Sequence, residues 1–315
     1  MCIRDRDETQ KLYNPDMIFR FASDLTKITI NSSIQFNGIW FMYGLANLIE
    51  VTGPDNHPGC SFLDGCVYNK DFTELLYCPS GKKCELEDLP DSVVAIGKYA
   101  FVQNRHLSKF IVPDKIVSLG TWCCYRTPIT EVFVPENCSI TGDNNFGRCN
   151  NLTKATLNTT NITATSLFES CENLETVTLA NGLPSIPNSM FANCSSLDNV
   201  TIPDSVTSIG TFAFYNCGTL TEITIPKNVI SIGSQAFSYD ALLGTIISLP
   251  LTAPSLGNNV FDGSKGTPPV TYYVGCDVSG NKILRVVKGS VNYDKGDWQN
   301  VLQDLAGFLI DSNLT

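Results

Sequence analysis

One pattern of apolar residues recurs along most of the chain at intervals of 22 or 23 residues. Its leading residue stands at Leu107, Ile129, Leu152, Leu174, Leu197, Leu220 and Leu243. The stretches that begin at Leu197 and Leu220 agree at nearly every apolar position. A fixed period of this length is typical of a solenoid, in which each repeat stacks on the previous one and contacts only its neighbours. We therefore expect the 315 residues to form mainly one elongated array of repeats.

Each repeat has the residues expected of one coil of the solenoid. The segment 200–202 alternates apolar residues with Thr, which predicts a short β-strand. Pro203 ends that strand because it cannot donate to the strand ladder, and the pair Pro203-Asp204 begins a turn. Five later residues of the same coil are predicted to point inward: Val206, Ile209, Ala213, Phe214 and Cys217.

Stacking is needed to bury these side chains, because a single coil leaves its interior open at both ends. Phenylalanine recurs at one place in the coil and predicts a nearly continuous aromatic spine: Phe101, Phe146, Phe168, Phe191, Phe214, Phe237 and Phe261. One coil carries Cys123-Cys124 where the others carry Ala-Phe. A smaller or rearranged interior is therefore expected near residue 124.

The repeat unit Leu-x-x-Ile-x-Ile-Pro-x-x-Val-x-x-Ile-Gly-x-x-Ala-Phe-x-x-Cys resembles the BspA-like class of leucine-rich repeats. Residues 62–70 and 75–79 resemble the Asp-Gly-Val-Leu-Tyr hairpin that is often inserted between such coils, and residues 253–298 resemble a terminal unit of bacterial members. The resemblance covers about residues 21–303. It implies a leucine-rich-repeat solenoid with short parallel strands on one face, loops and turns on the other, an inserted β-hairpin and a C-terminal capping unit.

Three segments are predicted. Residues 1–20 match no repeat, and we interpret this charged segment as truncated or artefactual; it does not have the apolar stretch of a signal peptide. Residues 21–262 form the solenoid, with the hairpin insertion at about 59–84, and residues 263–315 form a C-terminal capping segment. Within that segment, the apolar spacing over 294–309 predicts an amphipathic helix that covers the open core of the last coil.

Charge and composition argue against several classes of function. The net charge is −10, from 31 acidic and 21 basic residues, and the basic residues form no stripe of the kind that nucleic acids bind. The chain has no run of 18 apolar residues, so we expect no direct membrane insertion. It has neither a Gly-x-Ser-x-Gly elbow nor a phosphate-binding glycine loop. We therefore expect a protein that is not an enzyme and has no cofactor.

The thirteen cysteines fall into two main groups. Cys149, Cys171, Cys194 and Cys217 each precede the next leading residue by three positions, which predicts a ladder of buried thiols that pack like small apolar groups. A second group brackets the hairpin: Cys60, Cys66, Cys78 and Cys84. A zinc site or a hairpin disulfide is conceivable there, but the familiar zinc-ligand spacings are absent, so we assign no metal site. His57 and His106 are both predicted to be solvated in loops.

Partner binding is expected on the outward side of the strands, because residues alternate between the two faces of a sheet. The outward residues are Lys109, Ile111, Glu131, Phe133, Lys154, Thr156, Thr176, Thr178, Asn199, Thr201, Glu222 and Thr224. Four threonines at one position of successive coils should form a ladder along the sheet: Thr156, Thr178, Thr201 and Thr224. Ile111 and Phe133 share one outward position on neighbouring coils, which marks them as a candidate contact for a partner, unless a loop or the hairpin covers them.

The resemblance implies a cell-surface or secreted binding protein that presents its repeat face to a protein or glycan partner, with adhesion as one such role. Two alternatives remain open. The chain is the repeat region of a larger surface enzyme, or it is an intracellular protein-interaction scaffold. The sequence does not identify the partner.

Overall fold

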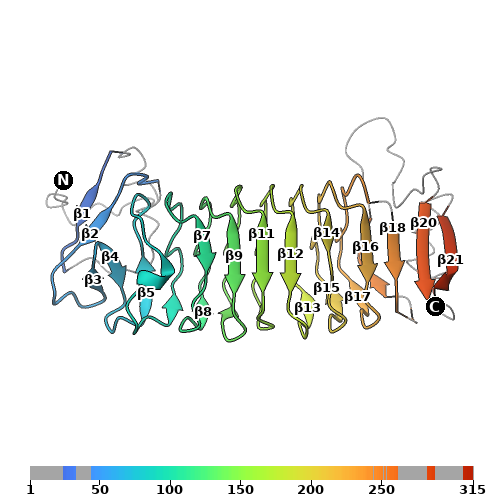
Figure 1. The fold of residues 1–315 in the computed structure, drawn as a ribbon, viewed down its shortest axis with the longest axis horizontal. Coiled ribbons are helices and arrows are strands. Elements are labelled where there is room, and N and C mark those ends of the chain that lie inside the picture. Colours follow the sequence, from blue (N-terminus) through green and yellow to red (C-terminus); the bar gives the residue numbers. More distant parts are fainter. Residues whose placement is uncertain are drawn as a thin grey trace, which may run out of the picture.

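The computed structural model describes residues 24–32, 44–243, 245–250, 252, 254–261, 282–287 and 308–314. At residue 245 and in the last two ranges the description covers the backbone alone. The chain forms a row of stacked coils that is long in the direction of stacking, and one strand of each coil runs across the row (Figure 1). The predicted solenoid is confirmed.

The main sheet consists of short parallel strands, each contributed by a different coil. Its first part contains β7 (Lys109–Ile111), β9 (Glu131–Val134), β11 (Lys154–Leu157), β12 (Thr176–Leu179) and β14 (Asn199–Val200). Its second part contains β16 (Glu222–Ile225), β18 (Thr245–Ser248), β20 (Lys282–Val287) and β21 (Phe308–Leu314). Equivalent residues of successive coils pair, as in Lys109 with Glu131 and Glu131 with Lys154. The sequence period is therefore the step from one strand to the next.

A second set of parallel strands follows the second apolar pair of each coil. It contains β6 (Ala95–Ile96), β8 (Ser118–Leu119) and β10 (Ser139–Ile140), and further along β13 (Ser185–Ile186), β15 (Ser208–Ile209), β17 (Ser231–Ile232) and β19 (Ser255–Leu256). The coils approach closely after these strands, since a Cβ on Gly210 would lie 2.6 Å from the backbone nitrogen of Asn188. The side that was expected to hold loops and turns therefore also holds a narrow ladder.

The amino-terminal end contains the predicted hairpin. Strands β1 (Lys27–Thr29) and β2 (Glu50–Thr52) pair in parallel, and β3 (Ser61–Leu63) pairs with β4 (Cys66–Tyr68) in the antiparallel sense. The two-residue turn at Asp64-Gly65 has φ of 47° and 73°, which is the left-handed conformation that such hairpins require. Strand β5 (Glu74–Tyr77) pairs with β4 and with β6, so the hairpin extends the second set of strands. A short 3-10 helix, η3 (Leu86–Asp88), follows.

The phenylalanine spine is continuous through the described coils. Ring centroids from Phe146 to Phe261 follow one another at 5.2 to 5.9 Å, and each ring is stacked on the next. In the coil with Cys123-Cys124, the ring of Phe110 takes the missing place, 6.2 Å from Phe101 and 5.3 Å from Phe146. The expected rearrangement near residue 124 is therefore an aromatic side chain supplied by the neighbouring strand.

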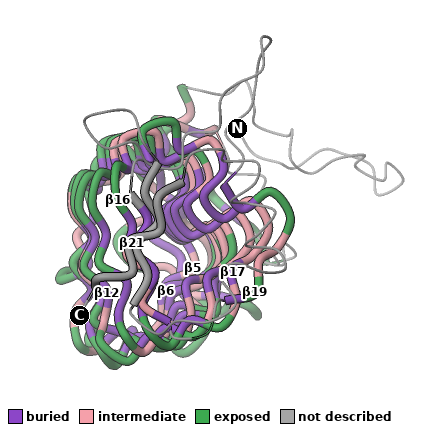
Figure 2. The backbone as a smooth tube through the Cα atoms, turned by 90° about the vertical axis from the view of Figure 1, so that its right-hand side faces the viewer, coloured by how far each residue is buried: buried purple, intermediate pink, exposed green. Residues whose placement is uncertain are grey.

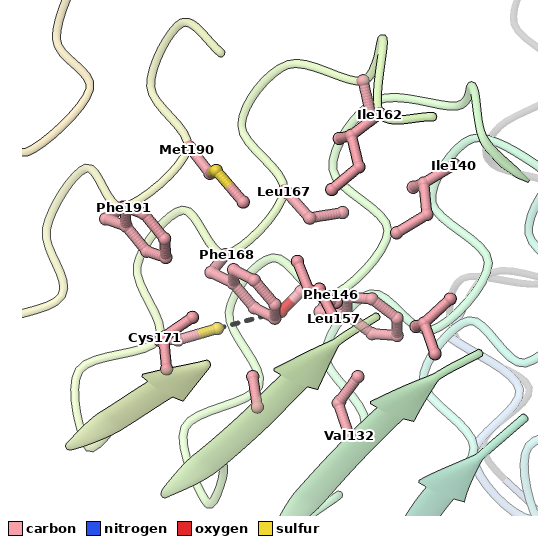
Figure 3. Packing of buried hydrophobic residues seen from close by; sticks show 14 of the residues in the cluster. Val132, Ile140, Phe146, Leu157, Ile162, Leu167, Phe168, Cys171, Met190 and Phe191 are labelled. Atoms are coloured by element: carbon pink, nitrogen blue, oxygen red, sulfur yellow. Dashed lines mark hydrogen bonds between the residues drawn. The ribbon is translucent and has the colours of Figure 1, made fainter. Parts of the chain in front are cut away.

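The cysteine ladder is anchored to the backbone of the preceding coil. The Sγ atoms of Cys149, Cys171, Cys194 and Cys217 donate to the carbonyl oxygens of Cys124, Phe146, Phe168 and Phe191 at 3.0 to 3.2 Å. Figure 3 shows one of these bonds, from Cys171 to Phe146, inside the apolar core. Each thiol therefore both fills space and satisfies a buried carbonyl oxygen.

Seen along the stacking axis, the coils overlie one another with the buried residues inside and the exposed residues on the rim (Figure 2). The turns that carry the phenylalanines form the remaining side, and their backbone N–H groups donate to the next coil, as from Phe168 to Met190 at 2.9 Å. Backbone hydrogen bonds therefore join coils along this side as well as along the two sets of strands. Within the residues described here, no helix has the length and apolar character needed to cross a membrane.

Two predictions are corrected. His57 is not solvated: it is fully buried, its Nδ1 lies 3.2 Å from Cys60 Sγ, and its ring meets Phe62 edge to face. His106 is exposed, as predicted. The predicted helix over 294–309 is wrong at its end, because Phe308 and Leu309 begin strand β21, where they extend the main sheet as backbone partners of β20. Its residues 294–307 lie outside the described residues, as does the segment 1–20.

Candidate functional site

The twelve outward residues predicted from the sequence lie on one side of the main sheet, and none of them is buried. We call this surface the strand face. One row of paired residues runs Lys109, Glu131, Lys154, Thr176 and Asn199. A second row runs Ile111, Phe133, Thr156 and Thr178. Residues up to 90 positions apart in the sequence thus lie on one continuous surface because the coils stack in register.

The first row begins with three charged residues that pair with one another. The Nζ atoms of Lys109 and Lys154 lie 3.3 and 3.2 Å from the two carboxylate oxygens of Glu131. The hydrogen bonds from Lys154 and Lys109 lower the pKa of the Glu131 carboxyl. Exposed pairs of this kind add little to stability because water screens them. They do give this end of the strand face a net positive charge beside the apolar residues of the second row.

Ile111 and Phe133 lie side by side at the start of the second row. Their backbones pair directly, from β7 to β9. Ile111 remains 37% exposed and Phe133 is half-buried, so neither the hairpin nor a loop covers Ile111. An apolar pair beside charged side chains has the composition of a small protein-binding surface, in which apolar contacts lie at the centre and charges at the rim.

The threonine ladder is interrupted, which corrects the prediction of four threonines in a row. Thr156 and Thr178 pair as expected. Strand β14 ends at Val200, however, so Thr201 lies beyond the last paired residue. Strand β16 pairs with β18 and not with β14, and Thr224 therefore pairs with Ile247. The main sheet is thus split into two parts between β14 and β16.

A depression of about 350 Å³ lies at this interruption. Four residues of the strand face line it: Asn199, Thr201, Glu222 and Thr224. Other lining residues include Asp198, Asp204 and Thr221, and Lys227 pairs with Asp204 at 2.9 Å. Hydroxyl, amide and carboxylate groups therefore surround a space that is within the usual size of small-ligand sites. Such groups can accept and donate hydrogen bonds to a polyhydroxylated ligand.

Sequence reasoning missed some residues of this surface. Ile247 occupies the same position on β18 as Thr224 on β16 and is half-buried. It could have been found by continuing the repeat by one coil. Asp198, Asp204 and Thr221 carried no such signal, because they lie beside the strands and become neighbours only where the ladder is interrupted.

The cysteines around the hairpin separate into a cluster of three and a single residue. The Sγ atoms of Cys66, Cys78 and Cys84 all lie within 4.8 Å of one another, and all three residues are buried. We call them the thiol cluster. Cys60 is not part of it and contacts His57 instead. The sequence named these four cysteines as one group, so the structure removes Cys60 from the candidate set.

The thiol cluster lies beside a depression of about 570 Å³, which Cys66, Cys84, Lys82, Lys83 and Asp88 help to line. The side chains of Cys66 and, less strongly, Cys78 donate toward Cys84 and lower the pKa of its thiol. Burial raises the pKa of Cys78, which is farther from solvent. One thiol of the three therefore favours the thiolate form, which is both the nucleophilic and the metal-binding form of cysteine.

Comparison with known proteins supports the fold. The model of the BspA type leucine rich repeat region matches residues 77–167 and 161–268, in 6 copies. No curated protein matches the chain. A leucine-rich repeat protein from Eubacterium ventriosum is 24% identical, with a TM-score of 0.57, and the alignment covers 67% of this chain and 58% of that one. A second, from Bacteroides ovatus, is 19% identical, with a TM-score of 0.51 and coverage of 92% and 85%.

At these levels of identity the two solved structures support the fold alone. The chain spans 58% of the length of the Eubacterium ventriosum protein. The family model, in contrast, matches the chain from residue 77, at the end of β5, to residue 268, a range that includes the strands from β6 to β19. On the strength of that match, the chain belongs to the BspA type of leucine-rich-repeat proteins.

Proposed function

We propose that this chain is a cell-surface or secreted binding protein, without catalytic activity of its own, whose strand face contacts a protein or glycan partner. The observation that carries the proposal is the apolar pair of exposed Ile111 and half-buried Phe133, which lies beside a row of polar and charged side chains. The family resemblance supports the location at the cell surface.

The two halves of the strand face suit different contacts. Near β7 and β9, the apolar pair and the cations Lys109 and Lys154 suit a protein surface with acidic residues around an apolar centre. Near β14 and β16, the depression with Thr201, Glu222 and Thr224 suits a hydroxyl-rich group such as a sugar. A glycoprotein would engage both halves, and adhesion is one role that such a contact would serve.

The proposal is tested by changing the apolar pair without disturbing the core. The Phe133→Asp variant places a charge at the centre of the strand face, and Ile230→Asp is the matched control, since Ile230 is 71% exposed and lies away from that face. Both proteins are immobilised and compared for binding to surface proteins and to an array of glycans. If Phe133 is an interface anchor, its replacement costs about 2 kcal/mol, or roughly 30-fold in affinity.

The control should bind as the wild type does. Equal binding by wild type and Phe133→Asp would remove the apolar pair from the binding site. Loss of binding in both variants would place the interface elsewhere on the coils. Circular dichroism and thermal unfolding of all three proteins establish that each remains folded.

A further inference from the structure

The thiol cluster differs from the cysteine ladder in the contacts that its sulfur atoms make. In the ladder, each thiol donates to a carbonyl oxygen of the preceding coil at 3.0 to 3.2 Å. In the thiol cluster, the bonds to carbonyl oxygens are long, at 3.9 Å from Cys78 to Pro79 and from Cys84 to Glu85. The sulfur atoms of the cluster instead face one another. Cys78 and Cys84 stand one period before Phe101 and Leu107, at positions where most other coils carry an apolar residue, whereas Cys66 belongs to the hairpin. Packing within the repeat alone therefore does not explain why the three sulfur atoms meet.

The positions of the three sulfur atoms fit a metal ion better than a disulfide. A tetrahedral zinc ion with Zn–S bonds of about 2.3 Å holds its sulfur ligands about 3.8 Å apart. The sulfur atoms of the cluster lie within 4.8 Å of one another, so small side-chain adjustments reach that spacing. A disulfide requires about 2.05 Å between two sulfur atoms and leaves the third thiol without a role.

The segments that carry the three residues are held in place by bonds that do not involve the thiols. Cys66 directly follows the tight Asp64-Gly65 turn. The loop that joins Cys78 to Cys84 is fixed by Asn104, whose Nδ2 donates to the carbonyl oxygens of Pro79 and Lys82 at 2.8 Å. Such support is what a ligand set needs in order to bind an ion without large rearrangement.

Asn104 also acts on the cluster itself. Its Nδ2 lies 3.6 Å from the Sγ of Cys78, in a position to donate to a thiolate there. Hydrogen bonds of this kind to a ligating atom orient it and tune the metal that it binds. A deeply buried amide is thus directed at the sulfur atom that is farthest from solvent.

The depression beside the cluster is lined by charges of both signs. Three thiolates and one Zn²⁺ carry a net charge of −1, and the lining includes Lys82 and Lys83 as well as Glu50, Asp64 and Asp88. Cys66 and Cys84 also line that depression, so the fourth coordination position of the ion would face it. A water molecule can reach that position, as in zinc sites with three protein ligands.

We propose that Cys66, Cys78 and Cys84 form a three-thiolate site for a thiophilic metal ion, Zn²⁺, with its fourth coordination position open to the depression. Soft thiolate ligands select ions of this class over Mg²⁺ and Ca²⁺, which prefer oxygen. The site lies at the hairpin end of the solenoid and is independent of the strand face. By joining β4 to the loop before η3, the ion would cross-link the hairpin to the first coils.

The test uses the full chain in reduced form, titrated first with Co²⁺ and then with Zn²⁺. Tetrahedral cobalt with thiolate ligands gives visible absorption bands and a near-ultraviolet sulfur-to-metal charge-transfer band, and zinc displaces it. We expect one Co²⁺ per chain and its complete displacement by Zn²⁺. The Cys84→Ser variant should weaken zinc binding by more than the roughly 10- to 100-fold that follows loss of an outer-shell partner.

Cys138→Ser is the matched control, because Cys138 is buried and also makes only a 3.9 Å bond to the next carbonyl oxygen. It should bind cobalt as the wild type does. A second readout does not depend on the cobalt spectrum: zinc should raise the thermal midpoint of the wild type and of Cys138→Ser, but not that of Cys84→Ser.

Three outcomes would overturn the proposal. The first is that the reduced chain takes up no Co²⁺ with thiolate bands. The second is that Cys84→Ser and Cys138→Ser bind zinc equally well. The third is a disulfide between two of the three cysteines in protein isolated from its own cells, shown by mass spectrometry of unreduced peptides.

Discussion

Asp240 occupies the position of the cysteine ladder in its coil, 23 residues after Cys217. It is buried, and its Oδ1 accepts a hydrogen bond from the backbone N–H of Cys217 at 2.7 Å, while its Oδ2 has no partner. Burial raises the pKa of the Asp240 carboxyl well above its ordinary value of 3.8, and the bond from Cys217 acts in the opposite direction. We predict that this carboxyl is protonated in the folded protein well above pH 4.

The sign of the pH dependence follows from this shift. Between the ordinary pKa and the raised one, the folded state holds a proton that the unfolded state has lost. The contribution of Asp240 to stability is therefore fully present below about pH 3.8 and is lost as the pH rises toward the folded pKa. Each pH unit in that interval costs about 1.4 kcal/mol. Asp240→Asn keeps the oxygen acceptor for Cys217 and cannot ionise, so the variant should lack this loss.

The assay is urea unfolding of wild type and Asp240→Asn between pH 4 and pH 8, followed by circular dichroism. The difference in unfolding free energy should grow by about 1.4 kcal/mol per pH unit in favour of the variant and then level off at the folded pKa. Asp204→Asn, which removes an exposed carboxylate, measures the effect of one surface charge. A difference between wild type and Asp240→Asn that stays constant across this range would refute the reasoning.

Two further predictions concern the fold. Phe191→Ala removes a fully buried ring from the middle of the aromatic spine and should cost about 3 to 5 kcal/mol, whereas Ile230→Ala, at an exposed position, should change stability by less than about 0.5 kcal/mol. Urea unfolding measures the loss of unfolding free energy in both variants. Equal losses would contradict the role of the aromatic spine in stabilising the fold. Gly65→Ala places a side chain at φ of 73° and should cost about 1 to 2 kcal/mol in thermal unfolding, more than Gly218→Ala, whose Cβ would meet nothing. Equal melting temperatures for the two variants would contradict the turn geometry.

Much of the fold follows from the repeat itself. The spacing of the leading residues predicted the coils, the parallel strands and the cysteine ladder, because each depends on residues at fixed positions within one coil. The second set of strands was not predicted, since two-residue strands such as Ser208–Ile209 are too short to show an alternating pattern. The insertion of Phe110 into the spine depends on the space left beside Cys124, which the repeat pattern does not describe.

The sequence predicted which residues form the strand face but not the shape of that surface. Alternation along each strand identified Ile111 and Phe133, and stacking in register brings them together. The depression arises because β14 is shorter than its neighbours, and no local signal at Thr201 marks that end. The sequence did not predict the thiol cluster for a different reason. Its three cysteines are spaced 12 and 6 residues apart, and their sulfur atoms come together only when the hairpin folds.

The proposed strand face is tested most directly by photo-cross-linking from within it. A benzoylphenylalanine residue is placed at position 133, between Ile111 and Thr156, and in a second protein at position 230, outside the strand face. Both proteins are irradiated with the bound partner, and cross-linked peptides are identified by mass spectrometry. The proposal predicts partner peptides joined at position 133 and none at position 230. Cross-links at position 230 alone would contradict it.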